Sequence, residues 1–312
     1  MSDMDFRIGP AITHFLHTQG PRGFLWRFAL AYALVTLALQ AISLWTQGPV
    51  YEIYLRACAE NDCNFEPYID DLNAVSMQTN ALSLLMLPLT LGIWAVFEGA
   101  SQRRYIRVEG FQIRLGADEG RLALVGLIWF ALLVAGYFAL AFGVALPAVI
   151  AGLAFGVLGG VLAGGVVFLG LMFAGLYLFA RLSPASALTI RDQQIRFFEG
   201  WSLTRGQGLG LAGSYFLLML AMMLVMLVFY ALLFFLGFVL LMPTISAAEG
   251  SDVAAATIAG IRQPAFWAPM SLASLLLLTL FGVGAHALGG PAAWFVLRNT
   301  DAGGAVISET FE

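Results

Sequence analysis

The sequence predicts an all-α integral membrane protein, a polytopic bundle of six transmembrane helices arranged as three hairpins, each preceded by an interfacial elbow helix. Of the 312 residues, 60% are hydrophobic and 11% are charged, and the mean hydropathy is +0.86. A soluble domain is about 45–50% apolar and about 25% charged, so a soluble fold of this length would leave too much apolar surface in water. The charged residues also stand in groups separated by long uncharged stretches. These observations exclude a disordered chain, a soluble α/β domain and a nucleic-acid-binding protein.

The lengths of the uncharged stretches indicate the number of crossings. One crossing of roughly 30 Å of hydrocarbon takes about 20 helical residues at 1.5 Å per residue. The stretch between Arg121 and Arg181 is long enough for two helices, with Pro147 at the expected break, whereas each other stretch fits one. The predicted membrane domain is 24–297, with spans at 24–46, 79–99, 122–143, 148–181, 209–242 and 265–297; a cytoplasmic amphipathic segment, 1–23, precedes it and a cytoplasmic tail, 298–312, follows it.

The basic residues predict the orientation of these spans. All fifteen are arginines, and with this set of spans only Arg56 and Arg262 fall on the side opposite to the other arginines. Cytoplasmic loops of membrane proteins carry an excess of basic residues. We therefore expect a multi-pass protein of the bacterial inner (cytoplasmic) membrane with both termini in the cytoplasm.

The predicted outer loop, 47–78, is acidic and contains the two cysteines of the chain. Cys58 and Cys63 are expected to form a local disulfide if the loop faces an oxidising compartment. A zinc site is not expected, because no histidine lies on that side. The carboxylates indicate either a cation site or a solvated acidic loop, and their spacing matches no calcium loop. They are Glu52, Glu60, Asp62, Glu66, Asp70 and Asp71.

Three inner segments have the character of interfacial helices. Residues 9–18 place Ile12, Phe15 and Leu16 on one helical face and polar side chains such as His14 on the other. The inner loops 105–126 and 189–213 share a plan in which an Ile-Arg pair leads through a mixed apolar and charged stretch into the next span. We expect an elbow helix in each.

Three neighbouring arginines after the second predicted span are a candidate lipid site. Arg103, Arg104 and Arg107 directly follow a predicted span, and juxtamembrane arginines gain about 1 kcal/mol each near an anionic leaflet. They either bind anionic lipid headgroups or only help to fix the orientation of the spans in the membrane.

Two further candidates lie within the predicted spans. His286 is either a haem ligand, part of a proton path or a packed side chain near a helix end. Glycines recur every four residues, which predicts one face of small residues on a helix and close helix packing, either within the chain or between subunits. They are Gly152, Gly156, Gly160 and Gly164.

A resemblance to a known family lies at 181–207, where the chain reads RLSPASALTIRDQQIRFFEGWSLTRGQ. This segment resembles the membrane domain of bacterial glycerophosphoryl diester phosphodiesterases and related stand-alone six-span membrane proteins, in which a Trp-x-Leu-Thr-Arg-Gly-like motif closes an amphipathic stretch. The soluble catalytic domain has no counterpart here, so the resemblance implies a membrane module for lipid or for a partner and does not imply hydrolysis. The matching residues are Trp201, Leu203, Thr204, Arg205 and Gly206.

The sequence contains no nucleophile elbow, no phosphate-binding loop and no HExxH motif. We therefore expect no catalytic residues, no metal and no cofactor. The expected function is a non-catalytic scaffold that is oligomeric or joins a membrane-protein complex and contacts membrane lipids, including anionic ones. The alternative is a transporter or channel for a lipidic or uncharged solute; an intramembrane enzyme is the third hypothesis.

Overall fold

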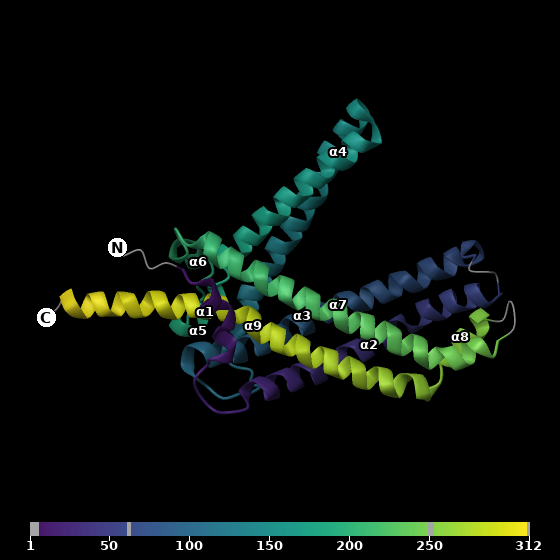
Figure 1. The fold of residues 1–312 in the computed structure, drawn as a ribbon, viewed down its shortest axis with the longest axis horizontal. Helices are drawn as coiled ribbons and strands as arrows, with labels where there is room; N and C mark the ends of the chain where they lie inside the picture. The colour runs from purple at the N-terminus through teal and green to yellow at the C-terminus, as the bar shows by residue number, and fades with distance from the viewer. Residues whose placement is uncertain (1–5, 61–63, 249–252, 311–312) are drawn as a thin grey trace. The chain divides into compact units, whose positions relative to one another are not determined.

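The structure is a computed structural model that describes residues 6–60, 64–248 and 253–310, and every regular element in these ranges is a helix (Figure 1). Five helical stretches are long and apolar enough to cross a membrane: Phe24–Cys58, Glu66–Arg107, Ala117–Asp192, Gly208–Ser246 and Pro264–Asn299. The all-helical fold is thereby confirmed, with lengths typical of a multi-pass membrane protein. The helices are α1 Ile8–Thr13, the 3₁₀ helices η1 His14–Leu16 and η2 Glu66–Tyr68, α2 Phe24–Glu60, α3 Ile69–Arg107, α4 Ala117–Leu182, α5 Ala185–Asp192, α6 Glu199–Leu203, α7 Gly208–Ser246, α8 Val253–Ile261 and α9 Pro264–Thr310.

Contacts between residues divide the chain into two compact units. The first unit comprises the chain up to Phe24, Leu91–Leu220 and the chain from Ala285 onward. The second unit comprises Leu25–Thr90 and Ala221–Gly284. Helices α2, α3, α7 and α9 each run from one unit into the other. All inner segments of the predicted topology fall in the first unit.

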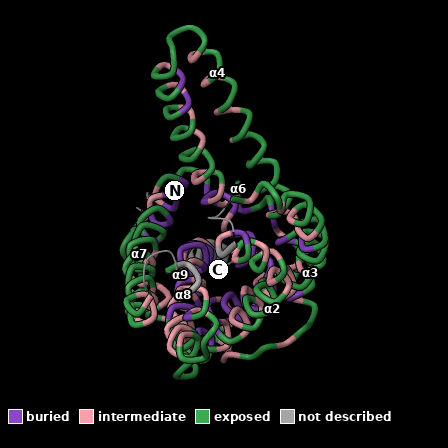
Figure 2. Tube along the Cα trace, turned by 90° about the vertical axis from the view of Figure 1, so that its right-hand side faces the viewer, coloured by how far each residue is buried: buried purple, intermediate pink, exposed green. Residues whose placement is uncertain are grey.

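Helix α4 reverses its direction at Gly156. This glycine has φ +76° and ψ −178°, a conformation that residues with a Cβ avoid. Figures 1 and 2 show the two arms of α4, 117–155 and 157–182, running side by side. The predicted break at Pro147 was therefore wrong, and the arms are not 122–143 and 148–181. A proline removes one backbone hydrogen bond without reversing the chain, so the helix continues through Pro147.

Helices α2 and α3 extend well beyond their predicted spans. Helix α2 ends at Glu60 and η2 begins at Glu66, so most of the predicted loop 47–78 is helical. Polar side chains on this extension bond to the neighbouring turn: Gln47 Nε2 donates to Ser43 Oγ at 3.1 Å, and the Tyr51 hydroxyl donates to Gln47 Oε1 at 3.0 Å. Polar residues end an apolar run in the sequence, but a helix continues wherever its backbone bonds continue.

Only some of the predicted elbow helices form. Helices α5 and α6 precede α7, and α1 with η1 occupies the predicted N-terminal amphipathic segment. The segment 108–116 before α4 is not helical, which corrects the prediction there. Helix α3 ends at Arg107 because Val108 takes a left-handed conformation with φ +59°, which a helix does not accommodate.

The first unit has a packed core near the ends of its helices and an exposed apolar hairpin. Ala180 of α4 packs with Leu211 and Tyr215 of α7, and all three are buried. The arms of α4, by contrast, are mostly exposed in Figure 2, and Phe155 at the reversal is 80% exposed. Apolar side chains in such positions are those that lipid covers.

Candidate functional site

Most of the predicted site residues lie where helix ends of the first unit meet. We call this region the polar junction: residues 98–121 and 177–207 together with His14 and His286. Apolar contacts hold the ends together, because Ile106 of α3 and Leu188 of α5 both pack in a cluster with Val296 of α9. Polar side chains fill the spaces between these contacts.

Arg103 and Glu119 form a buried ion pair that joins α3 to α4. Their side chains are 2% and 3% exposed. Glu119 Oε2 also accepts a hydrogen bond from the backbone N–H of Gly116 at 2.8 Å, which caps the first turn of α4. Arg103 Nε lies 3.5 Å from a carboxylate oxygen of Glu109. The carboxylate of Glu119 therefore both pairs with Arg103 and caps the N-terminus of α4.

The two arginines beside this pair also have protein partners. Arg104 Nε donates to the hydroxyl of Thr18 at 3.2 Å, and Arg107 Nη1 donates to Asp118 Oδ2 at 2.7 Å. Arg103 and Arg104 are buried and the Arg107 side chain is 24% exposed, so the three arginines form no exposed patch. The reason is local, because carboxylates of the following loop and of the first turn of α4 fold back onto the basic end of α3. The two alternatives for them, headgroup binding and topology alone, stay predictions.

His286 is a packed side chain at the centre of the junction. It is 0% exposed, and its Nδ1 lies 2.7 Å from the hydroxyl oxygen of Ser101. The ring of Tyr105 stacks on it with centroids 4.5 Å apart, and the Tyr105 hydroxyl donates to the His286 carbonyl oxygen at 2.7 Å. A serine bonded to a histidine is a pairing used for nucleophilic catalysis. Here Ser101 is also 0% exposed, so a substrate does not reach the pair.

His14 completes this stack from the N-terminal segment. The ring of His14 stacks on the ring of Tyr105, which also stacks on His286, and the His14 and Tyr105 ring centroids are 5.3 Å apart. Burial, together with the positive charge that His17 can carry, lowers the pKa of His14 below its ordinary value. The sequence placed His14 on the polar face of an interfacial helix; the structure instead uses it to attach that helix to α3.

The family-like motif encloses a second buried arginine. Arg181, at the end of α4, is 8% exposed; its Nε donates to Thr204 Oγ1 at 2.7 Å, and its Nη2 donates to the carbonyl oxygen of Trp201. The guanidinium carbon lies 4.0 Å from the Trp201 ring centroid, within cation–π range. Among the described residues no carboxylate pairs with Arg181. Trp201 and Thr204 thus recognise Arg181, while Leu203, Arg205 and Gly206 continue the turn toward α7.

The four glycines do not form a stripe along one helix. Gly152 precedes the reversal of α4, Gly156 makes it, and Gly160 and Gly164 follow it. The prediction of one continuous face was wrong because it assumed that the helix runs straight through Gly156. Close packing occurs between the arms instead: a methyl group added at Gly160 would lie 2.8 Å from the Ala148 carbonyl oxygen and 3.2 Å from the Gly152 Cα.

The candidates of the predicted outer loop remain predictions. Cys63 lies outside the described residues, so its disulfide with Cys58 is not described, and Asp62 lies there too. Within the ranges 6–60, 64–248 and 253–310, no three histidine, cysteine or carboxylate side chains are placed to hold a metal ion.

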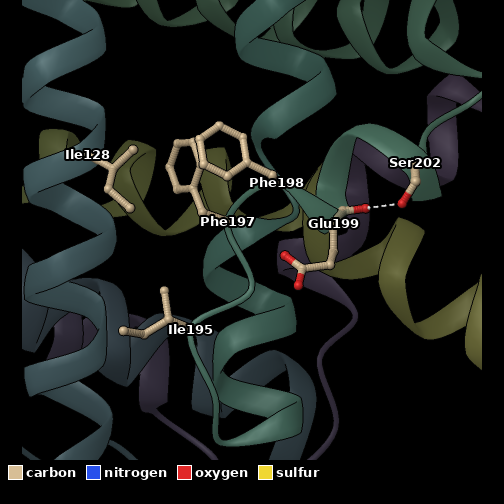
Figure 3. Close-up of a pocket in the computed structure, with 6 residues that line it drawn as sticks. All are labelled: Ile128, Ile195, Phe197, Phe198, Glu199 and Ser202. Atoms are coloured by element: carbon tan, nitrogen blue, oxygen red, sulfur yellow. Dashed lines mark hydrogen bonds between the residues drawn. The ribbon is translucent and has the colours of Figure 1, made fainter.

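Two adjacent hollows on the segment after α5 were not predicted. The first has a volume of about 480 Å³, and Figure 3 shows four apolar side chains, among them Phe197 and Phe198, together with Glu199 and Ser202 around it. The second, of about 370 Å³, shares Glu199 and Ser202 with the first; its other lining residues are Leu188, Arg191, Asp192, Arg196 and Leu203. The amphipathic run 194–199 was the available signal, but its pattern alone predicts only a surface helix.

No family model, no curated protein and no solved structure matches this chain. The resemblance at 181–207 therefore stays a prediction.

Proposed function

We propose that this chain is a non-catalytic scaffold of the bacterial inner membrane that assembles with itself or with a membrane-protein partner and contacts lipids. The observation that carries the proposal is that the chemically capable side chains of the polar junction bind one another. The Arg103–Glu119 pair is buried, and so is the Ser101–His286 hydrogen bond. Such pairs fix helix ends in place and leave little for a substrate.

A count of crossings supports the six-span topology of this scaffold. The chain leaves the polar junction along α2 and returns to it along α3; it leaves again along α7 and returns along α9. Helix α4 both begins and ends at the junction, since Glu119 binds Arg103 and Arg181 binds Thr204 there. Because α4 reverses at Gly156, it contributes two crossings. If the other four long helices cross once each, the total is six and both termini share one side.

The charges support a cytoplasmic location for that side. The junction contains arginines at the end of α3, at the start and end of α4 and in the segment 191–205, as the positive-inside rule requires of a cytoplasmic face. The outer side would then receive the reversal of α4 and the Cys58–Cys63 disulfide. An oxidising compartment favours that disulfide.

A labelling experiment tests the topology. Leu115 lies in the loop between α3 and α4 and is 85% exposed, so a cysteine there is accessible in the folded chain. With both native cysteines changed to serine, we expect Leu115→Cys to react with a membrane-impermeant maleimide in inverted vesicles but not in intact spheroplasts. Phe155→Cys, at the reversal of α4, is expected to show the opposite pattern or to be shielded by lipid. Labelling of Leu115→Cys from outside would refute the orientation.

Native mass spectrometry tests the scaffold itself. We expect the chain, released gently from its membrane, to appear as a defined oligomer or together with one constant partner. The alternative function is tested in parallel by the flux of a small uncharged solute through proteoliposomes. A monomer without a partner, accompanied by flux above that of protein-free vesicles, would replace the scaffold by the transporter.

A further inference from the structure

We propose that the two hollows beside α6 together bind one phospholipid whose headgroup is zwitterionic and carries a primary ammonium, as phosphatidylethanolamine does. This inference rests on the lipid contacts of the proposed function and specifies their chemistry. Neither hollow includes Arg103, Arg104 or Arg107, for which the sequence left headgroup binding and topology alone as alternatives.

A short reversal of the chain brings the charged groups together. Helix α5 ends at Asp192, and the next residue, Gln193, has a left-handed φ of +53°. The backbone N–H of Arg196 then donates to Thr189 Oγ1 at 3.2 Å, which turns the segment back toward α5. As a result, Arg196 and Glu199 reach the same hollow as Asp192.

The charges in this hollow balance and remain accessible. Arg191 Nε donates to Asp192 Oδ1 at 2.6 Å, and Arg196 Nη1 donates to Glu199 Oε1 at 3.1 Å. These side chains are 28–48% exposed, in contrast to the enclosed pair at Arg103. An exposed ion pair contributes only about 0–1 kcal/mol, so a ligand can exchange with it at little cost.

A zwitterion satisfies both signs of this charge set at once. A phosphate can accept hydrogen bonds from the guanidinium of Arg196, while a primary ammonium donates to the carboxylate of Glu199. An anionic glycerol headgroup would leave the carboxylate without a positive partner. A choline headgroup has no N–H with which to donate. The charge set therefore favours ethanolamine over both.

The neighbouring hollow identifies the ligand as a lipid rather than a soluble phosphate ester. Its lining residues other than Glu199 and Ser202 are apolar, and two of these, Ile195 and Phe198, are 45% and 66% exposed. Phe197 is fixed behind them by an edge-to-face contact with Trp129, with ring centroids 5.3 Å apart. Glu199, which Figure 3 shows beside the apolar side chains of the first hollow, also lines the second hollow. A headgroup in the charged hollow therefore has its acyl chains directed along the apolar one.

Native mass spectrometry with defined lipids tests the site. The purified protein is titrated with phosphatidylethanolamine, phosphatidylcholine and phosphatidylglycerol of identical acyl chains. We expect the ethanolamine lipid to bind about tenfold more tightly than the other two. One additional charge-assisted hydrogen bond, from its ammonium to the Glu199 carboxylate, contributes an affinity difference of about this size. Glu199→Gln should reduce this preference about tenfold, and Phe198→Gln should weaken all three lipids.

Matched controls keep the test specific. Arg196→Gln should weaken binding, whereas Arg205→Gln removes an equal charge from the same segment outside both hollows and should not. Leu115→Gln is the corresponding control for Phe198→Gln. Equal affinity for the three lipids, or an unchanged preference in Glu199→Gln, would overturn the inference. Competition by soluble glycerophosphoethanolamine as strong as that of the lipid would overturn the lipid assignment.

The same spectra separate this inference from the scaffold proposal. An oligomer without an ethanolamine preference refutes the lipid site and leaves the scaffold standing. A monomer that retains the preference refutes the scaffold and leaves the lipid site.

Discussion

Changing Glu119 to glutamine should destabilise the first unit more than any other single loss of charge in the polar junction. The substitution keeps the side-chain oxygen that accepts the Gly116 N–H, so the cap of α4 is retained. It removes the negative charge beside Arg103, which is 2% exposed and has little access to water. The change therefore measures the cost of removing the nearer of the two carboxylates that pair with the buried Arg103.

The structure sets the size of this effect. Removing one partner of a buried ion pair costs about 3–5 kcal/mol. Arg103 keeps a carboxylate oxygen of Glu109 at 3.5 Å, which offsets part of the loss. We therefore expect Glu119→Gln to lower the free energy of unfolding by about 3 kcal/mol. Asp118→Asn is the matched control, because its arginine partners Arg107, Arg114 and Arg121 are 24–40% exposed and water can replace the carboxylate; we expect about 1 kcal/mol there.

Reversible unfolding in mixed micelles of rising denaturing-detergent content, followed by circular dichroism, measures both changes. A double variant, Arg103→Met with Glu119→Gln, sharpens the test, because it removes the buried positive charge and keeps the oxygen that accepts the Gly116 N–H. Without a buried arginine that has lost its carboxylate, this variant should be more stable than Glu119→Gln alone. The reasoning fails if Glu119→Gln stays within 1 kcal/mol of the unchanged protein, or if the double variant is less stable than the single one.

Three further changes probe other parts of the first unit. Thr204→Val should cost about 1–3 kcal/mol in the same assay, because Arg181 loses a buried acceptor; no loss would contradict the role of the motif. Gly156→Ala should cost about 1–3 kcal/mol through its φ of +76°, whereas Gly165→Ala, which meets no neighbour, should cost nothing; equal effects would refute the strained reversal. Lowering the pH through about 6.5 should destabilise the folded packing of residues 8–20. Burial lowers the pKa of His14 in the folded chain, so the unfolded segment binds a proton more readily and is favoured as the pH falls. Hydrogen exchange of the backbone amides measures this, and constant protection of these amides between about pH 7 and 5 would contradict it.

The predictions that succeeded depend on local properties of the chain. The helix predicted at 209–242 lies within α7, Gly208–Ser246, and α2 begins at Phe24, where the first helix was predicted to begin. An apolar run of sufficient length forms a helix whatever it later contacts. The end of α2 was not predicted, because the change from apolar to polar residues indicates where a helix leaves the hydrocarbon and does not indicate where its backbone hydrogen bonds end.

The features that the sequence did not predict depend on contacts between distant residues or on one backbone angle. Ser101 and His286 are separated by 185 positions, and no local sequence pattern predicts their hydrogen bond. The prediction placed the break in α4 at Pro147 and gave the nearby glycines only a packing role. Pro147 interrupts hydrogen bonding, but the observed reversal uses a positive φ at Gly156, which glycine adopts at little cost. The sequence therefore predicted two helices correctly and divided them at the wrong residue.

A count of arginines can predict the orientation of the chain in the membrane, but it does not predict which arginines bind lipid. The positive-inside rule counts basic residues near span ends and takes little account of carboxylates, so it uses Arg103 and Arg196 in the same way. Lipid binding depends on what each arginine already holds. Arg103 is enclosed by Glu119, whereas the pair of Arg196 with Glu199 is open to exchange. Headgroup selectivity is therefore expected where basic and acidic side chains meet at the surface, and not where the basic residues are most dense.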